Sequence, residues 1–163
     1  MKLLEAKLKG ENTGLVLGAI TGLRNVEPSK GVIRLLAELY NSTHTAVIRK
    51  NIEEFMNDMK ESSLREEVVA EIRKEYKADT IRMLVSSCWQ SGLDYSPYAS
   101  DFTIIFTLCD YETAIECFTV IEGCSSRIQR KTKDHLIIIL KENEEIRATD
   151  KFSLMAELVA VLS

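Results

Sequence analysis

The sequence predicts an all-α fold, an α-α superhelix in which about nine or ten helices stack as antiparallel pairs. Apolar residues recur at spacings of three and four along almost all of the 163 residues, which is the period of amphipathic helices. Only two prolines and seven glycines interrupt this pattern. Because 45% of the chain is hydrophobic and 28% is charged, we expect one globular domain over residues 1–163.

Four helices are expected in the first 60 residues, the third from about Lys30 to Tyr40, with a polar turn over residues 41–45 after it. In chain order their apolar faces are Leu3, Leu4 and Leu8; Leu15, Ala19, Ile20 and Leu23; Val32, Leu35, Leu36 and Leu39; Val47, Ile48, Ile52, Phe55 and Met56. Ser62 or Ser63 is the expected cap of a fifth helix, with Glu66 completing a capping box. Asp79 is the expected cap of a sixth.

The longest loop is expected over residues 90–97, before a seventh helix that contains 102–109. Asp110 is the expected cap of an eighth helix, Tyr111 to Ile121, and Gly123 suits its C-terminal end. A ninth helix is expected over 126–142 and a tenth after Asp150. Residues 102–108 and 135–140 have strand-like composition, but no hairpin signal accompanies them, so we interpret both as buried helices.

A shift of 32 residues superimposes two predicted helices on the next two. Leu3 and Leu4 then coincide with Leu35 and Leu36. The second helix repeats in the same way, with Leu15, Val16, Ile20 and Leu23 falling on Val47, Ile48, Ile52 and Phe55. A helix pair repeated at a fixed period is typical of a solenoid, in which neighbouring units complete each other's core. Leu36, Ile52, Leu84 and Phe106 are therefore predicted to be core residues.

With these residues the chain resembles the HEAT family of helical repeats. The resemblance rests on the segment 32–39, the polar turn and Val47-Ile48-Arg49, with a later echo in 81–84 and 100–108. It implies repeat units of roughly 1–28, 29–60 and 77–122, with C-terminal helices over 126–163. The chain also departs from the family pattern, because the fifth helix is interpreted as an insertion between units. Asn41-Ser42-Thr43 stands where the family usually has an aspartate turn, and the period is shorter than is usual. The resemblance implies a scaffold or binding surface.

Composition excludes several classes of protein. The net charge is −4 and the pI is about 5.3, which argues against a general nucleic-acid binder. No apolar run is long enough to span a membrane, and residues 1–10 lack the core of a secretory signal. Cys88, Cys109, Cys117 and Cys124 show no zinc-site spacing, so we expect reduced thiols, a cytoplasmic location and no metal or other cofactor.

Gly14, Gly18 and Gly22 repeat every four residues on one face of the second predicted helix. Two interpretations stay open at this point. The glycines allow two helices to approach closely, as across a dimer. Alternatively, they serve packing within the chain, or three glycines at roughly 1 kcal/mol each simply leave this helix marginal.

Seven of the eleven aromatic residues lie between Arg82 and Arg127, a span without any lysine or arginine. Within it we predict a partner-binding loop carrying Trp89, Asp94, Tyr95 and Tyr98, which would favour a basic or amphipathic segment. The competing interpretation folds Trp89 and Tyr98 into the core and leaves Asp94 and Tyr95 exposed. A test of the loop is the double substitution Tyr95→Ala with Asp94→Lys.

Arg127, Arg130 and Lys131 are predicted to share one face at the start of the ninth helix. They form a candidate anion-binding cluster or, alternatively, a solvated helix face. His44 and His135, the only histidines, lie far from each other in sequence and suggest no catalytic triad.

The sequence therefore favours a non-catalytic protein–protein interaction module or scaffold. One alternative is a nucleic-acid-binding helical repeat like the HEAT-like DNA glycosylases, and another is a small-ligand-binding or enzymatic domain. The expected partner is another protein, and we expect no nucleic acid and no membrane as partners.

Overall fold

The computed structural model describes residues 1–27, 29–143, 146 and 148–163. In these ranges every regular element is a helix, ten α-helices and three short 3-10 turns, which confirms the predicted all-α fold of packed helices. The chain forms two compact units, Met1–Ser91 and Gly92–Ser163, which are described separately below. That they act as a single domain stays a prediction.

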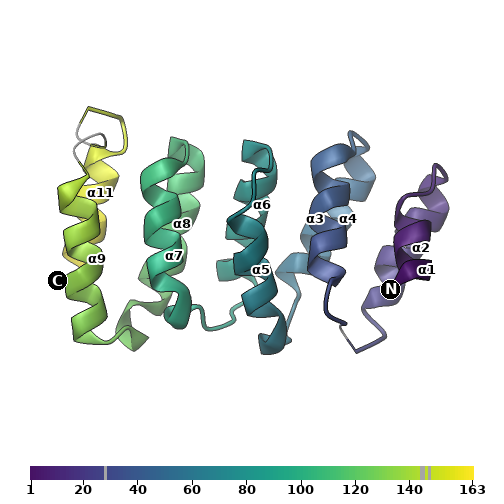
Figure 1. Ribbon diagram of the computed structural model, residues 1–163, viewed down its shortest axis with the longest axis horizontal. Coiled ribbons are helices and arrows are strands. Elements are labelled where there is room, and N and C mark those ends of the chain that lie inside the picture. Colours follow the sequence, from purple (N-terminus) through teal and green to yellow (C-terminus); the bar gives the residue numbers. More distant parts are fainter. Residues whose placement is uncertain (28, 144–145, 147) are drawn as a thin grey trace. The chain divides into compact units, whose positions relative to one another are not determined.

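The first unit contains three helix pairs arranged in two rows (Figure 1). One row consists of α1 (Lys2–Leu8), α3 (Val32–Ser42) and α5 (Arg65–Ile72). The other row consists of α2 (Thr13–Leu23), α4 (Ala46–Asn57) and α6 (Ala78–Gln90). Because α5 packs against both α3 and α6, it is the first helix of a third pair, and the sequence-based interpretation of it as an insertion is wrong.

In the second unit the described residues form two helix pairs. In the first pair α7 (Ala99–Leu108) packs against α8 (Tyr111–Cys124), and in the second α9 (Arg130–Glu142) packs against α11 (Phe152–Leu162). The helix α7 also contacts α9, and α8 contacts α11, so these pairs also stack side by side (Figure 1). The segments 102–108 and 135–140, whose composition resembles strands, are helical as predicted.

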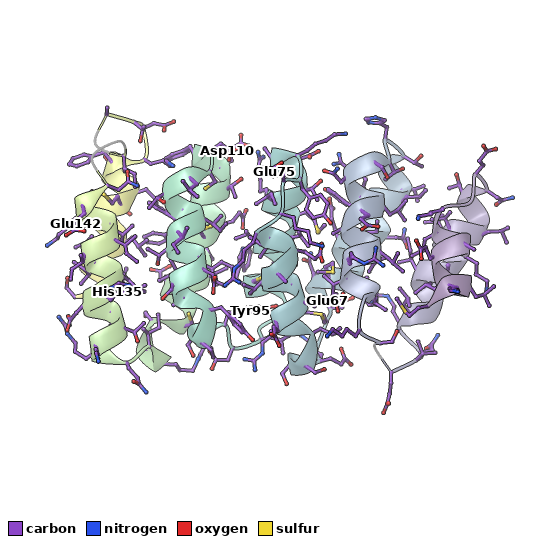
Figure 2. All side chains as sticks on the ribbon, viewed as in Figure 1. Glu67, Glu75, Tyr95, Asp110, His135 and Glu142 are labelled. Atoms are coloured by element: carbon purple, nitrogen blue, oxygen red, sulfur yellow. The ribbon has the colours of Figure 1, made fainter. Side chains whose placement is uncertain are left out.

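The core consists of the apolar stripes that the sequence marks. Leu36, Ile52, Leu84 and Phe106 are all 0% exposed, which confirms the predicted core positions. Figure 2 shows that side chains fill the space between successive helix pairs within each unit. The stacking of pairs thus provides the burial that an isolated pair cannot.

Of the helix caps that the sequence predicts, the one at Asp110 is confirmed. Asp110 caps α8, and its Oδ1 accepts a hydrogen bond from the Thr113 backbone N–H at 2.8 Å. The predicted capping box at Ser62 and Ser63 is wrong, because Ser62–Leu64 forms a 3-10 turn that leads into α5. Gly123 lies inside α8, which continues to Cys124.

Several helix ends are instead satisfied by side chains from distant parts of the chain. The Oδ1 atom of Asn41 accepts from the Lys77 backbone N–H at 2.9 Å, where α6 begins; Asp79 lies inside α6 and does not cap it. The two carboxylate oxygens of Glu67 accept from the backbone N–H groups of Gly31 and Arg34, at 3.0 and 3.2 Å (Figure 2). Both contacts tie one helix pair to the next.

In the second unit, the side chain of Lys151 binds backbone groups at the end of a helix that is distant in sequence. It stands at the N-cap of α11, the position predicted for Asp150, and is 6% exposed. Its Nζ donates to the carbonyl oxygens of Phe106, Thr107 and Cys109, at 3.0, 3.0 and 2.7 Å. A cation at a helix C-terminus meets carbonyls that have no partner within the helix, so this lysine stabilises the end of α7.

Candidate interaction surface

The predicted aromatic loop is not an exposed platform. Tyr95 is only 1% exposed, because a 3-10 turn over Ser96–Tyr98 directs it onto the core of the second unit. Its ring meets Phe102 edge-on, with 5.8 Å between ring centroids, and lies 6.1 Å from the ring of Tyr98. The expectation that Tyr95 would be accessible to a partner is therefore wrong.

Asp94 does not present an isolated negative charge either. Its carboxylate accepts from the Ser96 backbone N–H at 3.0 Å and pairs with Arg127 Nε at 2.9 Å. Burial by itself would raise the pKa of Asp94, but the hydrogen bonds from Ser96 and Arg127 outweigh it and the pKa is lowered. The loop itself contains no cation, but Arg127, 33 residues after Asp94, supplies one beside it.

Trp89 and Tyr98 differ in exposure. Trp89 is 43% exposed near the end of α6, in the first unit, whereas Tyr98 is half-buried in the second. The competing interpretation, in which Trp89 is core and Tyr95 exposed, is also wrong on both residues. Of the four predicted loop residues, Trp89 alone offers a large exposed apolar surface.

The basic cluster does not form on one helix face. Arg127 ends a 3-10 turn, Ser125–Arg127, and α9 begins only at Arg130. Arg130 pairs with Asp134 at 2.8 Å, and Arg127 pairs with Asp94. Lys131 is exposed. Since two of the three cations already face carboxylates, the arrangement does not converge on a bound anion.

The four cysteines are joined by no disulfide. A hydrogen bond with the Cys117 thiol, together with the nearby Lys151 ammonium, holds the pKa of Cys109 below its usual value. Burial raises the pKa of Cys124 to about 11. No cluster of three or more possible metal ligands occurs among the residues that the structure describes.

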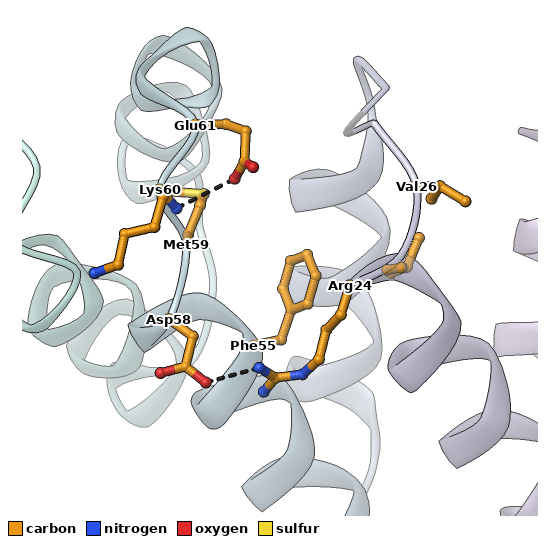
Figure 3. Close-up of a pocket in the computed structure, with 8 residues that line it drawn as sticks. Arg24, Val26, Phe55, Asp58, Met59, Lys60 and Glu61 are labelled. Carbon is orange, nitrogen blue, oxygen red and sulfur yellow. Dashed lines mark hydrogen bonds and ion pairs between the residues drawn. The ribbon is translucent and has the colours of Figure 1, made fainter.

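A small polar pocket lies between the ends of α2 and α4 (Figure 3). It has a volume of about 170 Å³, and Arg24 and Asp58 pair across it at 2.7 Å. The ammonium of Lys60 is hydrogen-bonded to the Ser91 carbonyl oxygen at 2.7 Å. These charges are satisfied by one another and by the backbone, so the pocket shows no group aimed at a ligand.

The helix α2 is unusual in the first unit because none of its eleven residues is charged. Val16 and Ile20 are its buried residues, while Leu15 is 67% exposed. A helix that is apolar on all sides is ordinarily buried on all sides. Here one face of α2 meets the neighbouring helices and the other is open to solvent.

A shallow groove of about 450 Å³ runs along this open face. Its lining residues come from α1, α2 and the turn between them, and they are Ala6, Lys7, Gly10, Gly14, Leu15, Gly18 and Ala19. Since α1 and α2 pack against α3 and α4 on their other side, a groove lined by neither α3 nor α4 faces away from the rest of the unit. Lys7 is the single charged residue of this lining.

The glycines of α2 are not required by packing within the chain. A Cβ atom added at Gly18 or Gly22 would meet nothing within 4 Å, and one at Gly14 would meet only the Asn12 side chain, at 3.3 Å. The sequence singled out these glycines without deciding between packing inside the chain and packing across a dimer. The open space above Gly18 and Gly22 excludes packing inside the chain as the reason for these two glycines, while close approach across a dimer and a marginal helix both agree with it.

Comparison with known proteins adds no identification: no family model, no curated protein and no solved structure matches the chain. None of the described helices combines the length and apolar character needed to cross a bilayer.

Proposed function

We propose that the chain is a non-catalytic protein–protein interaction module, built as a HEAT-like helical scaffold, and that it binds an apolar helical segment in the groove between α1 and α2. The observation that carries the proposal is the open, uncharged face of α2 beside that groove. Exposed apolar surface framed by polar residues marks interaction sites in proteins that otherwise bury such surface. Four cysteines without disulfides fit a reducing compartment, so we propose a cytoplasmic location.

The form of the groove favours a helix as ligand. Gly14 and Gly18 allow a backbone to approach α2 closely, and Leu15 stands at the rim to contact the apolar side of that segment. A helix laid in an apolar groove is a recurrent mode of peptide recognition. The groove presents no converging polar groups of the kind that orient a small substrate.

The test is recovery of bound proteins from native cell extract by three baits: wild type, Gly18→Glu and Gly123→Glu. Gly18 and Gly123 are both exposed helix glycines with open space around the position of Cβ, so both substitutions are compatible with the fold. We expect a partner that wild type and Gly123→Glu recover and Gly18→Glu loses. Equal recovery by all three baits would exclude the groove as the binding site.

A fourth bait, Trp89→Ser, tests the exposed tryptophan that remains from the predicted loop site. Loss of the partner with this bait, and retention with Gly18→Glu, would transfer the proposed site from α1–α2 to α6. We expect the opposite pattern, because Trp89 is a single exposed ring whereas the groove is a continuous apolar lining.

A further inference from the structure

We infer that the occupant of the α1–α2 groove is a second copy of this chain, and that the two copies form a two-fold symmetric dimer in which each inserts Leu15 into the groove of the other. This inference rests on the proposed function, since it names the partner for the same surface. It is carried by the shape of the surface, by its charges and by its glycines.

The surface contains both a projection and a depression. Leu15 is 67% exposed, and the groove beside it is floored by residues with little or no side chain, among them Gly14, Gly18 and Ala19. A two-fold interface brings the same patch of both copies together, so the patch must be complementary to itself. A leucine that projects next to a glycine-lined groove satisfies this requirement.

The charged residues at this end of the unit also suit a two-fold symmetric contact between two copies. Lys9 is paired with Glu5 at 2.7 Å, whereas Lys7 and Glu11 take part in no ion pair among the described residues. Lys7 lines the groove, and Glu11 lies in the turn between α1 and α2. Across a two-fold axis the lysine of each copy can face the glutamate of the other, which gives two identical ion pairs.

The glycines supply the third argument. In a helix interior, glycine is less favourable than other ordinary residues by up to about 1 kcal/mol. Gly18 and Gly22 gain nothing from packing in a single copy, because the space above them is open. The close approach of a second α2 uses that space, so the dimer accounts for residues that destabilise the helix in a monomer.

The first experiment is sedimentation velocity of purified protein from low to high micromolar concentration, with Gly18→Glu and the control Gly123→Glu. We expect a concentration-dependent dimer for wild type and Gly123→Glu, and a monomer at all concentrations for Gly18→Glu. Circular dichroism establishes that both variants are folded. A wild type that stays monomeric, a Gly18→Glu protein that dimerises like wild type, or assemblies beyond the dimer would overturn the inference.

The second experiment exchanges the two charges. Lys7→Glu places like charges opposite each other and should weaken dimerisation at least several-fold, whereas the double variant Lys7→Glu with Glu11→Lys should restore it. Failure of the double variant to restore the dimer would overturn the pairing of Lys7 with Glu11 across the axis.

The two proposals can fail independently. If the purified protein is monomeric, while extract yields another protein that Gly18→Glu loses, the second-copy inference falls and the proposed function stands. If the protein is monomeric and no recovered protein depends on Gly18, both fall.

Discussion

The helices α2 and α4 occupy the same position in successive helix pairs, but their outer faces are different. With the 32-residue shift, Val16 and Ile20 of α2 correspond to Ile48 and Ile52 of α4, and all four are buried. The exposed Leu15 corresponds to another exposed apolar residue, Val47, but the other outer positions differ in chemistry. Leu17, Gly18, Ala19, Thr21 and Gly22 in α2 stand where α4 has Arg49, Lys50, Asn51, Glu53 and Glu54.

The comparison shows which positions must be apolar for the helix pairs to stack and which positions can be either apolar or charged. Packing of successive pairs requires the buried residues, and these are apolar in both helices. The outer face of α4 carries an i,i+4 pair, Lys50–Glu54, and Arg49 reaches Asp79 on α6. The fold therefore accepts charges at these positions, and their absence from α2 needs an explanation outside the packing of one copy.

The largest expected effect tests the shared, buried part of the comparison. Ile52→Ala should lower the free energy of unfolding by about 2–5 kcal/mol, because it empties a site that is 0% exposed. Ile20→Ala should lie at the lower end of that range. Among the described helices of a single copy, α4 packs between α2 and α6, whereas in this row α2 packs against α4 alone. Urea unfolding followed by circular dichroism measures both, and equal losses would contradict this reasoning.

The core was predictable because the buried residues follow the helical spacing of three and four positions, which is visible in the sequence. A residue such as Ile52 repeats with its neighbours every three or four positions, and the face that results is the buried one. Helix ends were less predictable, because local capping rules consider only the next few residues. Asn41 acts on Lys77 and Lys151 acts on Phe106, at separations of 36 and 45 residues.

The site was only partly predictable for a related reason. Tyr95 lies between polar residues in a stretch that looks like a surface loop, and only the turn that places it on Phe102 buries it. The glycine spacing of α2 is visible in sequence, but the open space around Gly18 and Gly22 is not. The sequence therefore identifies the glycine-containing face of α2, but it does not show that this face is open to solvent.

The second prediction concerns a variant in which the outer face of α2 carries charged residues, as the outer face of α4 does. The double variant Gly18→Lys with Gly22→Glu should stabilise the monomer by about 1–2 kcal/mol, since each substitution removes a helix glycine and the new pair resembles Lys50–Glu54. Both Cβ atoms enter open space. Thermal unfolding at low protein concentration measures the gain, and a loss of stability would show that this face packs within the chain.

The third prediction converts α4 toward α2. Arg49→Leu places at this position the residue type of Leu17, and it removes both the ion pair with Asp79 and the stacking of the guanidinium on Tyr40, 4.1 Å from the ring centroid. The expected cost is about 1 kcal/mol, because the pair is partly exposed and screened by solvent. Arg49→Lys, which keeps the charge but loses the planar stacking, is the matched control and should recover part of the loss. An unchanged urea midpoint for Arg49→Leu would indicate that the pair contributes nothing.

The smallest expected effect is the dependence of that loss on pH. The hydrogen bond from Arg49 is the main cause that lowers the pKa of Asp79 from 3.8 in the folded protein. A carboxyl whose folded pKa is depressed stabilises the fold above its unfolded pKa, and this stabilisation is lost as pH falls through the folded value. The difference in unfolding free energy between wild type and Arg49→Leu should therefore be constant from about pH 7 to 5 and become smaller below about pH 4. The difference in unfolding free energy that remains at low pH comes from the stacking of Arg49 on Tyr40 and from packing, because protonation of Asp79 removes neither. Urea titrations of both proteins across this range measure the difference, and a gap that widens on acidification would show that Asp79 is not the partner that makes Arg49 stabilising.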